Sequence, residues 1–541
     1  MDKMLLKVQI GPVQEFIGQA RSTRDMWAGS YMLSWLAAAA MKVFKDAGSE
    51  FVFPALEEQP LYEMFCDSKK SSSTGLIPTL PNVFMVVVSG GKDEIKKLAA
   101  ESESALKEEL QVISGCCWQK MQKLGAEDSW KQRWNYQVTH FPIFTWQAVP
   151  CGVDWSDDVK RLSRALAARR NTHNFDQWGF TLSAENKVKS DQSLVSASKD
   201  VLSGKEEIIG TAEFWKESEI FWDGAGPYGA MNCIKRLFPL EYLNQRFNTR
   251  RTYWDNMSMI NTRDLAACNT DGVKGMDSKG EPNPVNGYMV VLAMDGDSMG
   301  AAIENLKTKE EYTRFSKTLA GFSEQHVPSI VAANEGQLVY AGGDDVLALL
   351  PASAALKCAK ELREAFKSSM HEYKLDSSCG IAVAHYMFPL QRTVQEARAA
   401  ETRAKNERGR PAFAMTLLKR SGEIIHWGGK WESNAYELYE QYTCMAQPDE
   451  ASSRFPYALL QLLQPYKLSP DTDKDFNGVV LKEFQHVRSR QVLCEKENPD
   501  GKFDKLAEGY LDHLFSENGN PADFANLFLA SAFMNRQRGE C

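Results

Sequence analysis

Two acidic turns, each placed beside short apolar segments, constrain the fold of this chain more than any other feature of its sequence. Residues 288–293 form an apolar segment that leads into Asp295 and Asp297, and its composition is typical of a buried strand. The second turn is Gly-Gly-Asp-Asp at residues 342–345, between two further apolar segments. Because glycine supplies the positive φ angles of tight turns, this stretch predicts a hairpin. The sequence therefore predicts strands whose ends carry several carboxylates.

The two turns would form one acidic site if their strands lie side by side. Neither turn contains a basic residue that would neutralise Asp295, Asp344 and Asp345. Clustered carboxylates are costly without a cation, and rigid oxygen ligands suit Mg²⁺ or Mn²⁺, which share their coordination with nucleotide phosphates. We expect two such ions, held by these aspartates and the carbonyl of Gly296. A solvated surface turn is the alternative for an Asp-Asp pair taken alone.

The order of segments around the turns favours a nucleotidyl-transfer palm over a surface turn. Thr308 and Glu311 form a capping-box pattern ahead of a long amphipathic helix. Helices are also predicted over residues 353–373 and 391–408, with a strand over 378–385 between them. Together with the strands at the acidic turns, these segments follow the β-α-β-β-α-β order of a ferredoxin-like module.

Candidate phosphate-binding groups lie close to these turns in the sequence. Backbone N–H groups at the start of a helix can bind phosphate. A lysine near the end of a helix either caps the negative dipole or binds phosphate, and beside this site we favour phosphate for Lys405. The nucleotide-binding candidates are Gly296, Asp297, Ser298, Met299, Gly300, Gly342, Gly343 and Lys405, with Arg408 or Arg410 farther out.

Residues 1–150 repeat the same order of segments but lack the acidic turns. Strands are expected at 4–10, 50–53, 83–89 and 136–149, and helices at 13–47, with a break near 21–23, and at 92–113. We expect a palm that has lost its metal ligands and retains a nucleotide pocket. Gln14, Arg24 and Asp25 are the candidates for that pocket, and a local Arg24–Asp25 ion pair is the alternative.

The expected fold class is α+β, with two ferredoxin-like palm domains, a mainly helical linker domain and a C-terminal helical bundle. The predicted domains are 1–150, 151–285, 286–428 and 429–541. The bundle is expected to contain helices at 432–445, 454–463, 475–488, 502–515 and 521–536.

The predicted linker domain holds the most basic run of the chain, together with two segments that look irregular. The basic run consists of Arg161, Arg164, Arg169, Arg170 and His173. It would contact RNA or a partner, or form a solvated face. A loop is expected at residues 192–210 and a connecting segment at 269–287.

Net charge, the lack of long apolar stretches and the cysteine pattern exclude several classes of protein. A net charge of −8 argues against a free-standing nucleic-acid binder. No stretch approaches the ~20 apolar residues of a membrane span, and the start lacks the pattern of a signal peptide, so we expect a cytoplasmic protein without a membrane partner. Eleven cysteines without a Cys-x-x-Cys pattern argue against a disulfide framework and a structural zinc site.

Several motifs resemble one family, the large subunits of type III-B CRISPR effector (Cmr) complexes. The motifs lie at residues 11–17, 23–31, 81–84, 234–238, 292–300, 339–348 and 380–386. The resemblance covers about the first 430 residues. It implies a subunit that converts ATP into a signalling nucleotide when its complex holds guide RNA paired to target RNA. The implied partners are the other Cmr subunits and these two RNAs.

The resemblance leaves the product open. Cyclic oligoadenylate, made from ATP alone, is the common product in the family, whereas some relatives without a nuclease domain join AMP to S-adenosylmethionine. Glu15, Phe16, Asp25 and Trp27 would supply the carboxylates and aromatic faces that a sulfonium acceptor requires. We favour cyclic oligoadenylate, with S-adenosylmethionine as the alternative co-substrate.

Three further expectations concern other activities. Many relatives begin with an HD nuclease domain, but none of the eight histidines here is followed by Asp, so we expect no such nuclease. A diguanylate-cyclase-like enzyme is an alternative, although such enzymes usually carry one palm per chain. A catalytically idle RNA-binding scaffold is another alternative, which the intact aspartates argue against.

Overall fold

The computed structural model divides the chain into two compact units. Unit 1 comprises Met1–Met259, Gly300–Glu324 and Tyr340–Gly343, and unit 2 comprises Ile260–Met299, Gln325–Val339 and Asp344–Cys541. The structure describes residues 3–18, 20–57, 59–70, 72, 74–172, 208–211, 214–215, 228–247, 260–267, 287–446, 454–490, 498–516 and 519–537. His173 and nearly all of the segments 192–210 and 269–287 lie outside the described residues. The four predicted domains remain a prediction.

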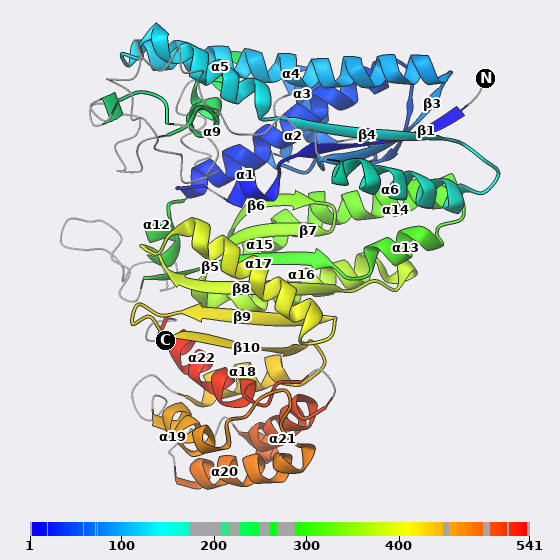
Figure 1. The fold of residues 1–541 in the computed structure, drawn as a ribbon. Helices are drawn as coiled ribbons and strands as arrows, with labels where there is room; N and C mark the ends of the chain where they lie inside the picture. The colour runs from blue at the N-terminus through cyan, green and yellow to red at the C-terminus, as the bar shows by residue number, and fades with distance from the viewer. Residues whose placement is uncertain are drawn as a thin grey trace. The chain divides into compact units, whose positions relative to one another are not determined.

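Unit 1 contains a four-stranded antiparallel sheet with the order β2-β3-β1-β4 (Figure 1). Its strands are β1 (Lys3–Gly11), β2 (Glu50–Phe53), β3 (Val83–Ser89) and β4 (Ile143–Pro150). The second and third strands are thus neighbours, and the first strand lies between the third and the fourth, as in a ferredoxin-like module. The predicted first palm is confirmed at the level of its sheet.

The helices of unit 1 bury apolar faces, and α2 is capped by Ser22, whose side chain accepts a hydrogen bond from the N–H of Asp25 at 3.1 Å. Helix α6 packs on β4 and β1. The helices are α1 (Gln14–Gly18), α2 (Thr23–Asp46), α3 (Pro60–Cys66), α4 (Lys92–Lys123), α5 (Lys131–His140), α6 (Trp155–Asn171), α9 (Ala230–Leu237) and α10 (Asn244–Phe247). Two further helices, α13 (Met299–Asn305) and α14 (Lys309–Gly321), belong to unit 1 except for Met299.

The prediction of a single extended segment over residues 136–149 is wrong in its first part. Residues up to His140 belong to α5, and β4 begins only at Ile143. Trp130, Trp134 and Val138 are buried and follow one another at intervals of four residues. This spacing places them on one face of a helical turn, so packing outweighs the preference of aromatic residues for strands.

Unit 2 is built around a six-stranded sheet with the order β10-β9-β8-β5-β7-β6. Its strands are β5 (Tyr288–Gly296), β6 (Gln337–Gly342), β7 (Asp345–Pro351), β8 (Ser377–His385), β9 (Ala412–Leu418) and β10 (Ile424–Lys430). The four predicted strands are present in ferredoxin-like order. β9, which pairs parallel to β8, and β10 are not among the predicted strands.

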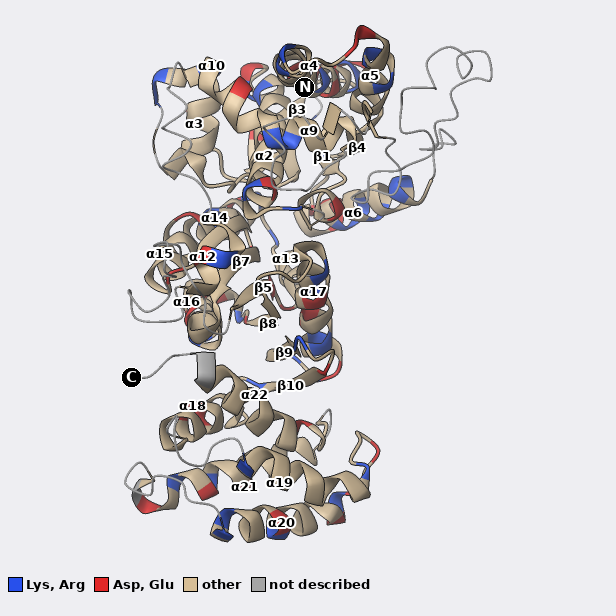
Figure 2. Ribbon diagram, turned by 90° about the vertical axis from the view of Figure 1, so that its left-hand side faces the viewer, with Lys and Arg blue, Asp and Glu red and all other residues tan. Residues whose placement is uncertain are grey.

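Helices α16 (Ala355–Ser369) and α17 (Leu390–Asn406) pack on the central strands of this sheet, and α17 contacts β8, β9 and β5. Acidic and basic positions both mark α17 in Figure 2. The long helix predicted after Thr308 is interrupted, because α14 is followed by a π-helical turn, Phe322–His326, and by α15 (Val327–Ala333). A short helix, α12 (Thr262–Ala267), precedes β5 in the chain.

The C-terminal part of unit 2 is a helical bundle, as predicted. Its helices are α18 (Ala435–Met445), α19 (Arg454–Leu463), α20 (Asn477–Arg490), α21 (Lys502–Leu514) and α22 (Asp523–Gln537). Tyr442, Phe455, Phe484, Phe503 and Phe528 are fully buried and form its aromatic core. Among the described helices, none combines the length and apolar character that crossing a lipid bilayer requires.

Candidate active site

The two acidic turns meet at the ends of the central strands of unit 2. Asp295 lies near the end of β5, and the residue before it, Met294, pairs with Val346 of β7. A Cβ atom added to Gly296 would lie 3.0 Å from the Cβ of Asp344, so glycine lets the hairpin aspartate pack against β5. The predicted juxtaposition of Asp295 with the hairpin is therefore present.

Local backbone geometry explains the two glycines of the hairpin. Gly343 has a φ of +81°, in the left-handed region that favours glycine. At Gly342 an added Cβ would lie 1.7 Å from the hydroxyl oxygen of Tyr340, so a side chain there would displace the Tyr340 ring. These constraints fix a tight turn directly before Asp344 and Asp345.

The carboxylates repel one another. Burial, together with the neighbouring charges of Asp295 and Asp345, raises the pKa of Asp344 to about 8. Burial also raises the pKa of Asp295, although Lys405 acts in the opposite direction. Such repulsion is what a bound cation would relieve, and carboxylate and carbonyl oxygens are suitable donors for Mg²⁺ or Mn²⁺.

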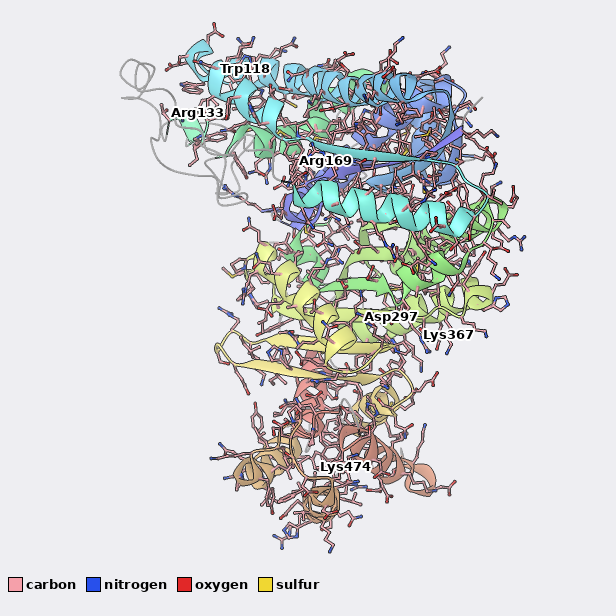
Figure 3. All side chains as sticks on the ribbon, turned by 45° about the vertical axis from the view of Figure 1, so that its right-hand side comes forward. Trp118, Arg133, Arg169, Asp297, Lys367 and Lys474 are labelled. Atoms are coloured by element: carbon pink, nitrogen blue, oxygen red, sulfur yellow. The ribbon has the colours of Figure 1, made fainter. Side chains whose placement is uncertain are left out.

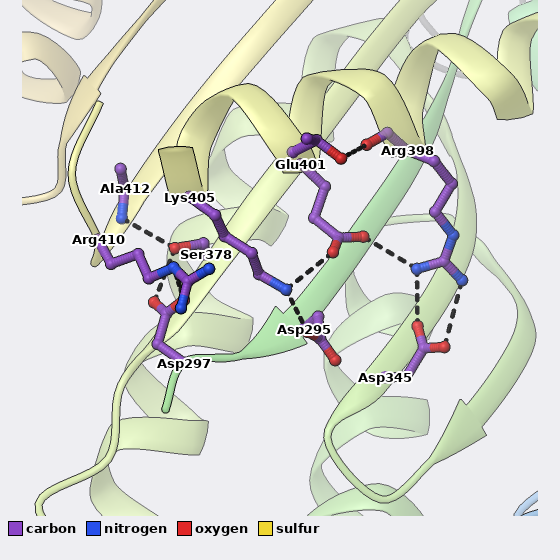
Figure 4. A network of polar contacts seen from close by, with 10 residues as sticks. Asp295, Asp297, Asp345, Ser378, Arg398, Glu401, Lys405, Arg410 and Ala412 are labelled. Carbon is purple, nitrogen blue, oxygen red and sulfur yellow. Dashed lines mark hydrogen bonds and ion pairs between the residues drawn. The ribbon is translucent and has the colours of Figure 1, made fainter. Parts of the chain in front are cut away.

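Two cations from α17 contact these carboxylates (Figure 4). Lys405 Nζ donates to Asp295 Oδ2 and, at 2.9 Å, to Glu401 Oε1. Arg398 donates to both carboxylate oxygens of Asp345, at 2.9 and 3.3 Å, and to Glu401 Oε2 at 2.9 Å. As they stand, no three His, Cys, Asp or Glu side chains among the described residues are grouped closely enough to hold a metal ion.

These contacts differ from the site predicted from the sequence in two respects. The turns themselves lack a basic residue, but α17 supplies two, and Arg398 and Glu401 are not among the predicted site residues. The sequence predicts that Lys405 binds phosphate, whereas in the structure it contacts Asp295. Burial disfavours its charged form, but the contacts with Asp295 and Glu401 prevail and raise the pKa of Lys405.

Small residues bring α17 close enough to the sheet for these contacts. A Cβ atom added to Gly380 of β8 would lie 2.1 Å from both the carbonyl oxygen of Ala397 and the amide nitrogen of Glu401. Ala400 and Ala404 of α17 are buried against Ala412 and Ala414 of β9. Close backbone approach therefore sets where Arg398, Glu401 and Lys405 can reach.

Asp297 has a different environment from the one predicted. Its N–H donates to the carbonyl of Asp376 at 2.9 Å, so it is not available to bind phosphate. Its side chain is buried; Oδ2 accepts a 2.7 Å hydrogen bond from Ser378, and Arg410 Nε lies 3.7 Å from Oδ1. Burial raises its pKa to about 6. Figure 3 labels Asp297 among the side chains of unit 2.

The remaining phosphate-binding candidates differ in their exposure. Ser298 is exposed with a φ of 61°, Met299 opens α13, and Gly300 is exposed. Arg410 is 45% exposed and remains available. Arg408 is not available to bind phosphate, because it is buried against Asp523 of α22, with Arg408 Nη2 and Asp523 Oδ2 2.6 Å apart.

The candidates for a second nucleotide pocket lie in unit 1. Gln14 is exposed at the start of α1, and Arg24 is half-buried in α2. Asp25 is buried and accepts two hydrogen bonds from Arg236, at 3.0 and 2.7 Å. The alternative of an Arg24–Asp25 pair is therefore wrong for the Asp25 carboxylate, whose partner comes from one of the predicted family motifs.

The residues suggested for a sulfonium acceptor are mostly engaged within the protein. Lys235, buried itself, places Nζ 4.0 Å from the ring centre of Phe16. Trp27 donates from Nε1 to the carbonyl of Leu76 at 3.1 Å. Glu15, in contrast, is exposed.

The described part of the basic run lies on α6. Arg161 pairs with Asp157 at 3.1 Å and also contacts Asp158, whereas Arg164 and Arg170 are exposed. Arg169, labelled in Figure 3, donates to the Thr172 hydroxyl at 2.7 Å. Contact with RNA or a partner remains a prediction for this helix.

Comparisons with known proteins match the second palm and the N-terminal part of the chain. A family model for the Cas10/Cmr2 second palm domain matches residues 288–414, and one for the N-terminal part of the CRISPR-associated protein Cmr2 matches residues 5–115. The CRISPR system Cmr subunit Cmr2 of Pyrococcus furiosus is 26% identical over 645 aligned residues, which cover 96% of this chain and 73% of that protein.

Solved structures share the fold. A chain of the type III-B Cmr-beta complex in the apo state has a TM-score of 0.66 at 11% identity, with 91% of this chain and 77% of that chain covered. The same complex bound to cognate target RNA gives 0.60 at 12% identity, with 89% and 78% covered. The Csm1-Csm4 cassette in complex with cA4 gives 0.51 at 12% identity, with 94% and 70% covered.

Proposed function

We propose, from the similarity of this chain to the Cmr2 large subunits of type III-B CRISPR effector complexes, that it is the ATP-converting subunit of such a complex. Its second palm joins ATP molecules into cyclic oligoadenylate and releases pyrophosphate. The observation that carries this proposal is the meeting of Asp295, Asp344 and Asp345 at the strand ends of unit 2.

The proposed partners are the other Cmr subunits, a guide RNA and a target RNA. The Cmr-beta complex with cognate target RNA supports the RNA partner, and the Csm1-Csm4 cassette with cA4 supports a cyclic oligoadenylate product. Since both similarities are below 25% in identity, the chemistry must rest on the residues of this chain.

The acidic site supplies the oxygen ligands for the metal ions of the reaction. Asp295, Asp344, Asp345 and the Gly296 carbonyl would hold two Mg²⁺ or Mn²⁺ ions, which would activate a ribose hydroxyl and neutralise the departing pyrophosphate. Asp344, whose ionisation is disfavoured beside two carboxylates, gains most from a neighbouring cation.

Lys405 and Arg410 bind the triphosphate. In the structure the ammonium group of Lys405 contacts Asp295. Triphosphate oxygens draw this group away, which frees the Asp295 carboxylate to bind a metal ion. Arg410 is half-exposed beside Asp297 and can turn toward phosphate. Backbone groups of Ser298, Met299 and Gly300 line the same phosphates, and Gly342 and Gly343 form the turn that presents Asp344 and Asp345.

The first palm presents the acceptor ATP. The candidate residues for binding this ATP are Gln14, which is exposed, and Arg24. Asp25 and Phe16 are held by Arg236 and Lys235, so neither is available to a sulfonium acceptor.

The test uses the assembled complex with target RNA, Mg²⁺ or Mn²⁺, and ATP, with and without S-adenosylmethionine. Mass spectrometry is expected to find cyclic oligoadenylate made from ATP alone. In the Asp344→Ala/Asp345→Ala variant the product is expected to disappear while assembly and RNA binding persist, because apolar strands hold the hairpin. A product that needs S-adenosylmethionine contradicts the proposed product, and parent-level pyrophosphate release by the double variant contradicts the site.

A further inference from the structure

We infer that Arg398 is a positioning residue for Asp345, and that through this contact it limits how tightly the acidic site takes a divalent cation before ATP arrives. The inference deepens the proposed function and rests on it. The side-chain hydrogen bonds of Arg398 go to Asp345 and Glu401 (Figure 4), so its influence on the site runs through these two carboxylates.

The Arg398–Asp345 contact has the geometry of an orienting pair. Two guanidinium nitrogens lie 2.9 and 3.3 Å from the two carboxylate oxygens. The side chains are only 23% and 24% exposed, so solvent screens the contact incompletely. A bidentate arginine fixes the plane of a carboxylate and partly neutralises it, but each oxygen retains lone pairs for a further ligand.

Arg398 is also the first member of a series of contacts along α17. Positions 398, 401 and 405 are spaced by three and four residues, so they share one face of the helix. Glu401 accepts hydrogen bonds from both Arg398 and Lys405, at 2.9 Å each. Charges of alternating sign thus connect the two acidic turns, in the order Asp345, Arg398, Glu401, Lys405 and Asp295.

The placement of α17 does not depend on Arg398. Gly380 and the buried alanines of α17 determine how closely the helix approaches the sheet. Removing the guanidinium group therefore leaves the helix in place and leaves Asp345 as an unpaired, unoriented carboxylate. The site then attracts a cation more strongly while presenting one of its ligands in a less fixed orientation.

The experiment measures Mn²⁺ binding to the full chain without nucleotide, by electron paramagnetic resonance at constant pH, and ATP turnover in the activated complex. For Arg398→Met we expect Mn²⁺ to bind at least about fivefold more tightly, because one positive charge beside the site is gone. We expect kcat to fall by at least about tenfold, with KM for ATP changed by less than about twofold. Arg398→Lys, which retains charge without the fork, should lie between Arg398→Met and the parent in both measurements.

Two further variants test whether the change in Mn²⁺ affinity comes from the Arg398–Asp345 contact. Arg392→Met removes a more exposed ion pair, Arg392–Glu396 at 2.6 Å, from the same helix and should leave Mn²⁺ affinity at the parent value. Adding Asp345→Asn to Arg398→Met should abolish the gain and bring Mn²⁺ affinity to the parent value or below it, since both the unpaired charge and a proposed ligand are removed.

Glu401→Gln provides a test of opposite sign that does not depend on the folding of Arg398→Met. Without the Glu401 charge, Arg398 and Lys405 hold the aspartates more firmly, so Mn²⁺ should bind more weakly. Unchanged Mn²⁺ affinity in Arg398→Met, or an equal change in Arg392→Met, overturns the inference while the proposed function stands. A parent that neither binds Mn²⁺ nor releases pyrophosphate overturns both.

Discussion

Substituting Gly380 by alanine should disturb both stability and activity, because α17 lies directly on this glycine. The added Cβ would be 2.1 Å from the carbonyl oxygen of Ala397 and from the amide nitrogen of Glu401, where contacts below 3.0 Å essentially never occur. Both neighbours are backbone atoms and cannot rotate away. The helix must therefore move by about 1 Å, and overpacking of this kind typically costs about 1–3 kcal/mol of unfolding free energy.

The same shift carries Arg398 and Lys405 away from the carboxylates that they contact. A displacement of about 1 Å in a catalytic arrangement can lower turnover by up to about 100-fold, so we expect a loss between about 10- and 100-fold. Urea unfolding of the chain and pyrophosphate release by the activated complex measure the two effects.

A matched glycine offers the control. Gly478, near the start of α20, has no atom within 4 Å of an added Cβ. Gly478→Ala should leave turnover unchanged and leave stability unchanged or raised by up to about 1 kcal/mol. If Gly380→Ala retains the parent's unfolding midpoint and turnover, the close seating of α17 does not control the site and the reasoning fails.

Three other outcomes are expected. Arg408→Met leaves Asp523 buried without its partner, so chemical denaturation should show a loss of about 3–5 kcal/mol; a loss below about 1 kcal/mol contradicts the pairing. Burial raises the pKa of Glu324 to about 7 from 4.5, so its folded state binds the proton more tightly and stability should decrease as pH rises from 4.5 to about 7. Glu324→Gln should remove that part of the pH dependence, and an unchanged profile in urea titrations argues against it. No metal-dependent cleavage of single-stranded DNA is expected, since no His-Asp pair occurs in the sequence; cutting that persists in the double aspartate variant contradicts this.

The structural predictions that were confirmed rest on short-range sequence patterns. The apolar run before Asp295 and the glycines before Asp344 have local preferences that agree with their tertiary positions, and the helices of the C-terminal bundle follow helical spacing. The extended prediction over residues 136–149 failed because Trp134 and Val138 satisfy a helical packing pattern that outweighs their local preference for strands.

The charged contacts of α17 could not be predicted from the turns alone. Arg398 lies 53 positions from its partner Asp345 in the sequence, and nothing near either residue specifies the other. A usable signal exists in the spacing of Arg398, Glu401 and Lys405, which places three charges of alternating sign on one face of a predicted helix. Only the close approach at Gly380 shows that this face reaches the site.

The bundle has a consequence for dissecting the protein. β10 is the outer strand of the six-stranded sheet, and α22 packs on it, with Asn526 Nδ2 donating to the carbonyl of His426 at 2.9 Å. Tyr510 donates its hydroxyl to the carbonyl of Gly428 at 2.7 Å. A fragment ending at the predicted palm boundary, residue 428, would remove the last two residues of β10 and uncover the rest of the strand. An uncovered edge offers unpaired peptide groups to other chains. Cutting the chain there should therefore produce aggregates in place of an isolated catalytic palm.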